Sequence, residues 1–591
     1  MKEFFKMLLA AVCGSVIAGI VTLVFFITFI GNLFTVETGP AVPPGSVLKV
    51  DMSEFAIAEQ PQTADLQAYL QGNVVESVTL WNAVQAIRSA SKDPRICMIY
   101  LKPDGAGAGI AQIEELRQAL AEFRQSGKPV ISFSEFPTTG AYWLATAADK
   151  IYLSSNKGAG PQINGIGTQM IFLGDLLNKL DINAQLIRHG KYKSAGEMFT
   201  KSSPSEENML QNRQMILSMW KTVSEEISVT RGIDAGKFET LVNDLKLNTC
   251  QDMVDNGLAD ELMTREELKE KLATLAMKEK FSDVSIVGFA DYIKVTARGC
   301  NAARPQVAIL FAEGEIVEGT SDTDIDGDRY ASVIAGLRRD ENVKAVVFRV
   351  SSPGGSVLAS DKILTEIELL RKEKPVIASY GDYAASGGYW ISNSCDKIYT
   401  DKTTLTGSIG VFSLVPDVSK TLRNHLHVNM VTVSSTKHNG GIFAPLDNQE
   451  KEAMQKQVDD IYTSFVAKVA TGRGLEPEYV NEIAQGRVWT GQDAIGLGLA
   501  DESGTLMDAV RYAYSLVGDA DPSTWNIGVY PQVEPDILGE LLSQVGSQGG
   551  SLDGIKAIES ITGVESLLLR WGRAVSKEKF FARLPYDIKI K

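Results

Sequence analysis

The sequence predicts an α/β protein of two tandem repeats with mainly parallel strands, plus an N-terminal transmembrane helix. Three observations support this prediction: motifs that recur in the same order, apolar strand-like runs that alternate with amphipathic helix-like segments, and a long charge-free run near the N-terminus. The chain has 591 residues, which is too many for one ordinary hydrophobic core. We therefore expect at least two folded domains behind a membrane anchor.

The N-terminal run from residue 7 to residue 34 contains no charged side chain. It is long enough to cross a bilayer as a helix and exceeds the apolar region of a cleavable signal peptide. Lys2 and Lys6 precede the run, whereas no Lys or Arg follows it before Lys49. Because positive charge stays on the cytoplasmic side, we expect a retained anchor with its N-terminus in the cytoplasm and the rest of the chain outside it.

The two halves of the chain repeat three stretches of sequence in the same order. The matched pairs are RICMIYLKPDGAG (95–107) with KAVVFRVSSPGGS (344–356), KPVISFSEFPTTGAYWLATAADKIYLSSNKG (128–158) with KPVIASYGDYAASGGYWISNSCDKIYTDKTTLTGSIG (374–410), and CQDMVDNGLAD (250–260) with GQDAIGLGLAD (491–501). A repeat of this kind indicates two copies of one structural unit.

Each repeat has the same local pattern. In the second, a strand-like run at 343–350 leads into a glycine turn, a helix-like segment at 361–370 follows, and a short strand at 375–378 comes next. Strands joined by helices imply crossover connections and parallel pairing. We therefore divide the chain into six parts: 1–36 (short cytoplasmic tip and transmembrane anchor), 37–46 (linker), 47–265 (first α/β repeat), 266–305 (connecting segment), 306–516 (second α/β repeat) and 517–591 (C-terminal tail).

The repeats differ at the positions that could carry chemistry. When the two repeats are aligned, Ser386 in YAASGGYW of the second repeat corresponds to Thr139 of the first. The intact SSPGGS of the second repeat corresponds to a degraded KPDGAG in the first. Lys193 of the first repeat, in contrast, falls opposite Asn439 of the second. One repeat has therefore kept a serine and the other a lysine.

A serine and a lysine can together form a catalytic dyad, in which the serine is the nucleophile and the lysine is its base. A serine hydroxyl is a weak nucleophile that needs a base within hydrogen-bond distance, and a buried lysine can be that base because burial favours its neutral form. A Ser-His-Asp triad is poorly supported, because none of the four histidines lies in a hydrolase motif. The SPGG turn at 352–355 and the N–H of Gly387 could supply the donors for an oxyanion.

The ordered set of motifs resembles a known family. The anchor, SSPGGSVLASD, YAASGGYWIS, TLTGSIGVF, GKYKSA and GRVWTGQDAIGLGLAD together resemble signal peptide peptidase A in its long, duplicated form, also called protease IV, and the resemblance extends to about residue 516. The family has the Clp/crotonase fold, so the resemblance implies tandem Clp/crotonase-like domains. It also implies roles for five residues: Ser386 (nucleophile), Lys193 (general base), Ser408 (positions the lysine), and Gly354 and Gly387 (oxyanion donors), with Gly355 as a competitor of Gly354.

The resemblance also implies partners and a location. The family cleaves hydrophobic peptides, notably released signal peptides, without a metal or organic cofactor, and its long members are homotetramers. We therefore expect a single-pass protein of the bacterial inner (cytoplasmic) membrane, in contact with lipid through its anchor and with its catalytic domains in the periplasm. The net charge of −15 argues against nucleic acid as a partner.

Two alternatives remain open. The chain could be a non-catalytic, membrane-anchored scaffold on the same fold, in which case a serine-directed phosphonate would not label Ser386. It could also be a crotonase-type enzyme acting on acyl-CoA. The second alternative lacks a carboxylate at a recognisable site and would require the domains to lie inside the cell.

Overall fold

The computed structural model describes residues 40–60, 76–296, 306–319, 321, 324–518, 526–532 and 580–583. The chain divides into two units, Met1–Val42 and Pro43–Lys591, and the fold below is that of the second. The predicted transmembrane run at 7–34 lies outside the described residues. Among the residues that are described, no helix is long and apolar enough to cross a membrane.

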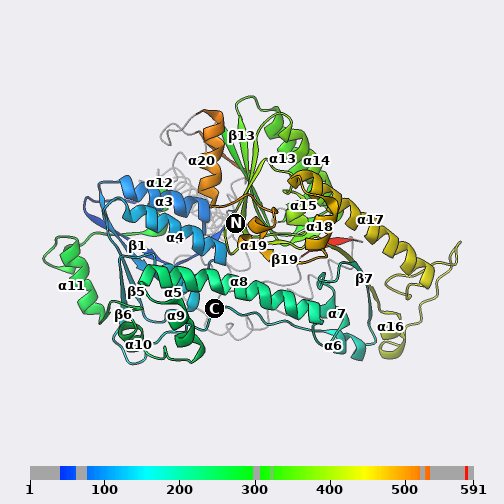
Figure 1. Ribbon diagram of the computed structural model, residues 1–591, viewed down its shortest axis with the longest axis horizontal. Coiled ribbons are helices and arrows are strands. Elements are labelled where there is room, and N and C mark those ends of the chain that lie inside the picture. Colours follow the sequence, from blue (N-terminus) through cyan, green and yellow to red (C-terminus); the bar gives the residue numbers. More distant parts are fainter. Residues whose placement is uncertain are drawn as a thin grey trace, which may run out of the picture. The chain divides into compact units, whose positions relative to one another are not determined.

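The first repeat is built on a six-stranded sheet whose strands all pair in parallel, as the sequence predicts. Its members, in spatial order, are β8 (Glu261–Met263), β6 (Lys150–Ser154), β5 (Val130–Ser134), β4 (Ile96–Lys102), β1 (Ser46–Asp51) and β9 (Ile286–Gly288). Crossover helices α4 (Ile110–Arg124) and α5 (Thr139–Ala145) connect β4 to β5 and β5 to β6. Figure 1 shows this repeat in blue to green.

The second repeat is built on an eight-stranded, mainly parallel sheet. Its strands, in spatial order, are β19 (Val488–Thr490), β17 (Leu405–Gly407), β15 (Val376–Ala385), β13 (Ala345–Ser352), β10 (Val307–Glu313) and β21 (Ile527–Tyr530). In addition, β16 (Lys397–Thr400) pairs with β15, and β20 (Glu502–Ser503) pairs with β16. Only the pairing of β17 with β19 is antiparallel. The α/β class with two mainly parallel sheets is therefore confirmed.

Both faces of the second sheet are buried. Successive side chains of β10 alternate between two apolar clusters: Ala308 and Leu310 lie on one side, and Ile309 and Phe311 on the other. Helices α13 (Gly327–Arg339) and α14 (Val357–Arg371) cover the first side, and α20 (Leu506–Val517) covers the second (Figure 1).

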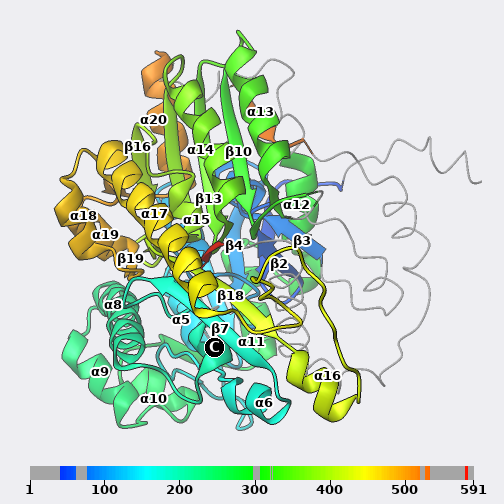
Figure 2. The ribbon, with the colours of Figure 1, turned by 90° about the vertical axis from the view of Figure 1, so that its right-hand side faces the viewer.

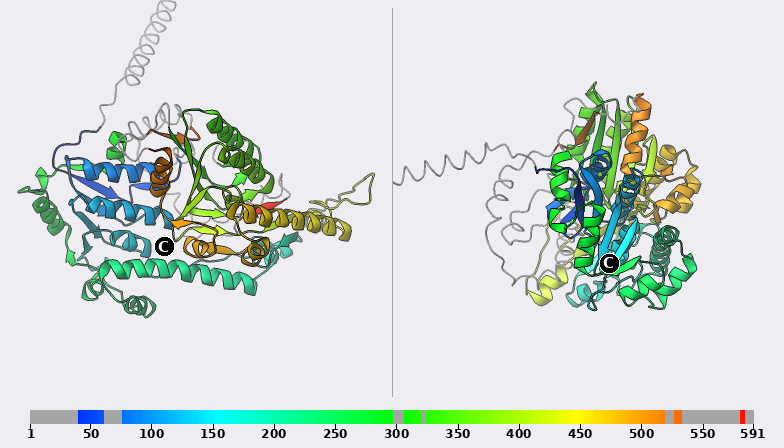
Figure 3. Two further views of the ribbon diagram at one scale, coloured as in Figure 1. Left: turned by 45° about the horizontal axis from the view of Figure 1, so that its top comes forward. Right: turned by 90° about the vertical axis from the view of Figure 1, so that its left-hand side faces the viewer.

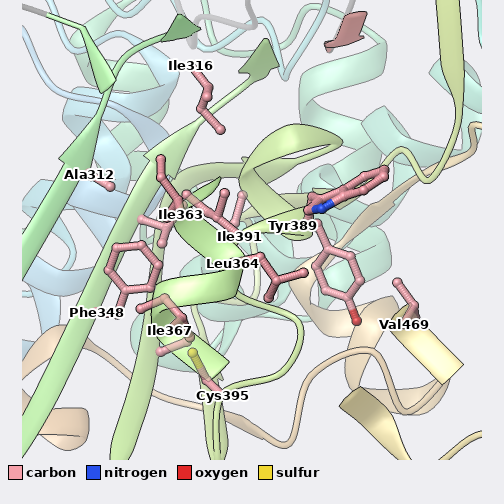
Figure 4. Close-up of a cluster of buried hydrophobic side chains, with 14 of the residues drawn as sticks. Ala312, Ile316, Phe348, Ile363, Leu364, Ile367, Tyr389, Ile391, Cys395 and Val469 are labelled. Carbon is pink, nitrogen blue, oxygen red and sulfur yellow. The ribbon is translucent and has the colours of Figure 1, made fainter. Parts of the chain in front are cut away.

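The larger of these clusters extends to the short helix α15 (Gly387–Trp390) that follows Ser386. Figure 4 shows Phe348 of β13 beside Ile363 and Ile367 of α14, with Tyr389 of α15 in the same cluster. Tyr389 is fully buried, and its hydroxyl donates to the carbonyl of Leu499 at 2.9 Å. The start of α15 is therefore fixed by the core of the second repeat.

A third sheet contains strands from both repeats. Its order is β12 (Ile325–Asp326), β11 (Ile316–Val317), β14 (Gly354–Ser356), β22 (Phe581–Arg583), β18 (Val411–Asp417) and β7 (Asn183–His189). Strands β7 and β18 pair antiparallel along their whole length, from Val411 opposite His189 to Asp417 opposite Asn183 (Figure 2). This pairing brings the segment that follows β7, which contains Lys193, to the second repeat.

Two long helices occupy corresponding places in the repeats. Helix α8 (Glu206–Arg231) follows β7, and α17 (Asn448–Arg473) follows β18. Each is capped at its start by a side chain, from Ser205 and Asp447 respectively. Each contacts the other repeat, because α8 lies against β19 and α17 lies against β7 (Figure 3).

Two segments that the sequence placed outside the repeats supply strands to their sheets. The connecting segment 266–305 contains β9, which pairs with β1, and the tail 517–591 contains β21, which pairs with β10. Both are edge strands of at most four residues. Such short strands show too little alternation to be recognised in a sequence.

Candidate active site

Ser386 stands at a sharp turn between β15 and α15. Its backbone has φ 56° and ψ −110°, a conformation that non-glycine residues rarely adopt. Two hydrogen bonds fix this turn: the N–H of Ser386 donates to the carbonyl of Gly407 at 2.8 Å, and the N–H of Trp390 donates to the carbonyl of Ser386 at 2.8 Å. The strained turn therefore holds the serine hydroxyl in one place.

The glycines after Ser386 are required by close backbone approach. A Cβ on Gly388 would lie 2.6 Å from the carbonyl oxygen of Ser352, and a Cβ on Gly387 would lie 2.9 Å from Oγ of Ser360. Both positions therefore exclude any side chain. These approaches hold the serine turn against β13 and α14, next to the SPGG turn.

Lys193 lies in the loop that follows β7 and is held by residues of the second repeat. The N–H of Tyr192 donates to the carbonyl of Gln485 at 2.9 Å. A Cβ on Gly486 would lie 2.6 Å from the backbone nitrogen of Lys193, so only glycine fits beside the lysine. The carbonyl of Lys193 accepts a hydrogen bond of 2.7 Å from Arg188. The backbone of the lysine is thus anchored on both sides.

The two residues meet in the interior of one chain. Nζ of Lys193 lies 2.7 Å from Oγ of Ser386, and the exposed fractions of the two residues are 1% and 0%. Burial lowers the pKa of Lys193 well below its ordinary value, and within the described residues no carboxylate forms a salt bridge with Nζ to oppose this shift. A neutral amine beside a serine hydroxyl can accept the hydroxyl proton.

Ser408 provides two further contacts to the same nitrogen. Both its carbonyl oxygen and its Oγ lie 3.1 Å from Nζ of Lys193. The N–H of Ser408 donates to the carbonyl of Arg487 at 2.7 Å, and its backbone has φ 52°. The predicted second serine therefore lies where it can orient the amine.

The glycines predicted as oxyanion donors lie close together, and their contacts bear on the choice between Gly354 and Gly355. The N–H of Gly354 donates to Oγ of Ser352 at 3.2 Å, so it already has a partner. A Cβ on Gly387 would lie 3.0 Å from the backbone nitrogen of Gly355, and a Cβ on Gly354 would lie 2.7 Å from the backbone nitrogen of Gly387, so both glycines lie next to Gly387. It is the hydrogen bond of the Gly354 N–H to Ser352 that favours Gly355 as the companion of Gly387.

Sequence reasoning missed the buried carboxylate that supports the lysine loop. Glu197 is fully buried and accepts hydrogen bonds from Arg188, Ser205 and Asn208 at 3.0, 2.7 and 3.2 Å. Burial alone would raise its pKa, but the hydrogen bonds from Ser205 and Arg188 lower it overall. The ionised Glu197 therefore holds Arg188, which in turn holds the carbonyl of Lys193. No motif in the sequence indicates this role.

A second missed feature is a buried charge cluster between the repeats. The guanidinium of Arg349, on β13, donates twice to Glu59 at 2.9 Å and lies 2.7 Å from Glu115 of α4. Burial raises the pKa of Glu115 to about 7. Because a buried charge left without its partner is costly, this cluster ties the first repeat to the second near β15.

Comparisons with known proteins place the chain in a family. The sequence profile of peptidase family S49 matches residues 122–279 and 368–518, one stretch in each repeat. Protease 4 of Haemophilus influenzae is 34% identical over 458 residues, which cover 75% of this chain and 74% of that protein. Protease 4 of Salmonella typhi is 33% identical over 479 residues, with coverages of 79% and 76%.

A plant protein and a solved structure are also similar to parts of the chain. The chloroplastic serine protease SPPA of Arabidopsis thaliana is 33% identical over 439 residues, which cover 72% of this chain and 64% of that protein. The solved structure of a ClpP1 point mutant from Listeria monocytogenes matches 34% of this chain and 94% of its own with 15% identity and a TM-score of 0.24, which is too low to establish a shared fold. The Clp/crotonase relationship thus stays a prediction, whereas the profile and the protease 4 relatives show that the chain belongs to peptidase family S49, a family of serine proteases.

Proposed function

We propose that this serine protease is a membrane-anchored endopeptidase that uses a dyad of Ser386 and Lys193 to cleave hydrophobic peptides through an acyl-enzyme. The observation that carries the proposal is the 2.7 Å contact between Nζ of Lys193 and Oγ of Ser386 in a buried site. Burial lowers the pKa of Lys193 and so favours its neutral amine, and the strained turn fixes the hydroxyl.

The reaction begins with proton transfer from Ser386 to the neutral amine of Lys193. Oγ attacks the scissile carbonyl, and the N–H groups of Gly387 and Gly355 receive the developing oxyanion. The lysine ammonium, held by both oxygens of Ser408, then gives its proton to the leaving amine. In the second half-reaction the lysine, again neutral, activates the water that hydrolyses the ester.

The surroundings of the dyad suit apolar side chains. An apolar cluster of Ala195, Phe412, Leu414 and Phe581 lies in the third sheet and the lysine loop, close to the site. These side chains are only 5–7% exposed, so they form an apolar core beside the dyad, and this apolar setting supports hydrophobic peptides as substrates. Released signal peptides have that character, and they are the substrate that the family resemblance implies.

The anchor and the assembly are part of the same proposal. The charge-free run at 7–34 has Lys2 and Lys6 before it and no Lys or Arg after it until Lys49, which supports a single-pass anchor in the bacterial inner membrane and catalytic domains in the periplasm. The long members of the family to which the motifs point are homotetramers, so we propose that state here. Protease accessibility from the periplasmic side and the mass of the detergent-solubilised protein would test location and assembly.

The catalytic proposal is tested by single substitutions. Ser386→Ala and Lys193→Ala should each reduce cleavage of a fluorogenic apolar peptide at least about a thousandfold, because neither member of a dyad works alone. Lys191→Ala is the matched control, since Lys191 is an exposed lysine two positions away whose amine lies over the ring of Tyr192. Wild-type rates in either dyad variant would disprove the proposal.

Labelling distinguishes the enzyme from the non-catalytic scaffold. A serine-directed phosphonate should modify Ser386 in the wild type and in Lys191→Ala. Labelling should fall sharply in Lys193→Ala, because the phosphonate reacts with the activated hydroxyl. If Ser386 were unlabelled in the wild type, the scaffold would be the better interpretation.

A further inference from the structure

The turn at residues 485–487, called the support turn below, is hydrogen-bonded to the segments of both Lys193 and Ser408. Its first carbonyl accepts the N–H of Tyr192 at 2.9 Å, and its last carbonyl accepts the N–H of Ser408 at 2.7 Å. Its middle N–H donates to the carbonyl of Ile409 at 2.7 Å. A displacement of the support turn would therefore move the lysine and the serine that orients it.

The support turn is strained at its first residue. The backbone of Gln485 has φ 54°, a conformation that is uncommon for residues other than glycine. A Cβ on Gly190 would lie 2.6 Å from the carbonyl carbon of Gln485, so the lysine loop lies directly against this residue. A strained backbone persists only where its surroundings hold it in place. The conformation of Gln485 therefore depends on its contacts.

Tyr462 of α17 provides these contacts. Its hydroxyl accepts hydrogen bonds from the backbone N–H of Gln485 at 3.3 Å and from Nε2 of the same residue at 3.0 Å. The hydroxyl donates in turn to Oδ1 of Asn481, on α18 (Pro477–Ile483), at 2.7 Å. These three bonds use the one donor and both acceptor sites of the hydroxyl. Tyr462 is only 3% exposed, so water has little access to them.

The ring of Tyr462 contacts the strand that leads into the lysine loop. It stacks on the ring of His189, the last residue of β7, with the ring centroids 3.9 Å apart and the planes inclined by 18°. Nδ1 of His189 also lies 2.7 Å from a carboxylate oxygen of Asp459, on the same helix as Tyr462. Figure 2 shows α17 alongside β7. Tyr462 thus touches both the start of the lysine loop and the turn against which that loop lies.

The first repeat has no hydroxyl at the matching position. Helices α8 and α17 each end at a glycine in the left-handed conformation, Gly232 and Gly474. When the helices are aligned on these glycines, Trp220 corresponds to Tyr462. The indole of Trp220 stacks on Phe238 with the centroids 5.9 Å apart, and an indole can donate a hydrogen bond but cannot accept one. The hydroxyl is therefore present only in the repeat whose support turn holds the lysine loop.

We propose that Tyr462 is a positioning residue of the dyad. Its hydroxyl holds Gln485 in the strained conformation, and the support turn then keeps the amine of Lys193 within reach of Ser386. This inference rests on the proposed function. Without the hydroxyl, Gln485 relaxes, the lysine loop shifts, and water reaches Nζ. The distance for proton transfer then grows, and the burial that lowers the pKa of Lys193 decreases.

Tyr462→Phe tests this inference, because it removes the hydroxyl and keeps the ring that stacks on His189. With an apolar peptide as substrate, kcat should fall about tenfold while KM stays within about twofold of the wild type. The apparent pKa in the pH profile of kcat/KM should rise toward the ordinary lysine value, because Nζ is less buried. An unchanged pH profile would overturn the inference, whatever the rate.

Tyr330→Phe is the matched control. Tyr330 lies on α13 and is 1% exposed, and its hydroxyl donates to the carbonyl of Phe311 on β10 at 2.9 Å. Each variant loses one buried hydroxyl, so each should lower the melting temperature. Only Tyr462→Phe should move the pH profile. A similar shift in Tyr330→Phe would mean that loss of stability alone causes it, and the inference would be wrong.

A double-mutant cycle with Gln485→Gly shows whether the hydroxyl acts through the support turn. Glycine adopts a positive φ without strain, so the turn then needs less support. Tyr462→Phe should therefore cost less than about threefold in kcat when it is combined with Gln485→Gly. A tenfold loss in both backgrounds would mean that the hydroxyl acts by another route, which contradicts the inference.

Asn481→Ala gives the answer should Tyr462→Phe fail to fold. Asn481 is exposed, so its truncation should leave the fold intact, yet it removes the acceptor that orients the hydroxyl of Tyr462. We expect a loss of about threefold in kcat and a pH profile shifted in the same direction. A wild-type profile in this variant would also count against the positioning role.

The dyad variants separate this inference from the proposed function. If Ser386→Ala and Lys193→Ala abolish cleavage while Tyr462→Phe behaves as the wild type, the proposed function stands and the positioning role fails. If the dyad variants cleave the peptide at the wild-type rate, the proposed function fails, and the inference fails with it.

Discussion

The same turn carries a nucleophile in one repeat and a structural hydroxyl in the other. Thr139, opposite Ser386, is the first residue of helix α5, and its Oγ1 accepts a hydrogen bond of 3.1 Å from the N–H of Asn164. Ser386 instead lies before its helix at φ 56°, with Oγ 2.7 Å from Lys193. Thr139 therefore stabilises a loop through its hydrogen bond, whereas the hydroxyl of Ser386 contacts the amine of Lys193.

The lysine position shows the reverse difference. Lys193 is enclosed by the second repeat, whereas Asn439 of the second repeat is exposed. Because β7 and β18 pair with each other, the loops after them are carried in different directions from one shared sheet. The duplicated chain therefore has two serine positions and two lysine positions. The single Ser/Lys dyad takes its serine from the second repeat and its lysine from the first.

The largest effect should come from giving Lys193 the residue of the other repeat. Lys193→Asn removes the only amine within reach of Ser386 among the described residues, so peptide cleavage should fall at least about a thousandfold. Steady-state kinetics with an apolar peptide measures this. Lys193→Arg should be equally inactive, because a guanidinium stays protonated. Activity in the arginine variant would mean that the site needs a positive charge and not a base.

The converse exchange, Ser386→Thr, should have the next largest effect. A β-branched residue is disfavoured at φ 56°, so the turn should relax and carry the hydroxyl away from Lys193. We expect a loss of about a hundredfold in kcat and a lowered melting temperature, measured by peptide kinetics and thermal unfolding. Near-normal kcat would show that the strained backbone is not needed to present the hydroxyl.

The pH dependence should report the buried amine. Only neutral Lys193 can accept the proton, and its pKa lies well below the ordinary lysine value. Below that lowered pKa, kcat/KM should rise about tenfold per pH unit, and it should level off above it. A plateau reached only near the ordinary lysine value would contradict the effect of burial.

The same shift makes a prediction for stability. In the pH window between the lowered pKa and the ordinary lysine value, the unfolded chain binds a proton that the folded chain does not. The contribution of Lys193 to folding therefore becomes less unfavourable as pH rises through this window. Lys193→Met should remove that part of the pH dependence, which denaturant unfolding at several pH values would measure.

A smaller effect is expected at Ser408. Ser408→Ala removes one oxygen at 3.1 Å from Nζ but leaves the carbonyl of the same residue in place. We expect a loss of about tenfold in kcat and a lower pKa in the pH profile, since the ammonium loses one acceptor. Ser408→Thr, which restores a hydroxyl, should recover part of the rate. An unchanged pH profile would mean that Oγ of Ser408 does not contact the amine during catalysis.

The two candidate site residues could be predicted from the sequence because aligning the two repeats shows where one repeat has a reactive side chain and the other does not. Ser386 and Lys193 were recognisable by comparison with Thr139 and Asn439, and the parallel strands followed from helices alternating with apolar runs. The choice between Gly354 and Gly355 could not be made, because it depends on whether Oγ of Ser352 already accepts from one of them.

Other features depend on contacts between residues that are distant in the sequence. The pairing of β7 with β18 joins segments more than two hundred positions apart, and the salt bridge of Arg349 with Glu59 spans a similar separation. Strand β22 has only three residues, and its pairing depends on the edges of β14 and β18. Local patterns carry no signal for such contacts.

The smallest effect on activity should come from the hydroxyl of the first repeat. Thr139→Val removes the buried acceptor of the N–H of Asn164, and because Asn164 itself is exposed, this change should cost only about 0.5–1.5 kcal/mol of unfolding free energy. Because Thr139 has no place in the dyad, kcat should stay within about twofold of the wild type at temperatures where the protein is folded. Denaturant unfolding and peptide kinetics on one preparation check both statements.

Thr139→Ser completes the comparison between the repeats. It keeps the acceptor for Asn164, so the free energy of unfolding should remain near that of the wild type. Placed in a Ser386→Ala background, it recreates a serine at the matching position of the first repeat but should restore no cleavage, because Asn439, the counterpart of Lys193, is an exposed amide that cannot act as a base. Recovered cleavage would mean that the first repeat has kept a working site.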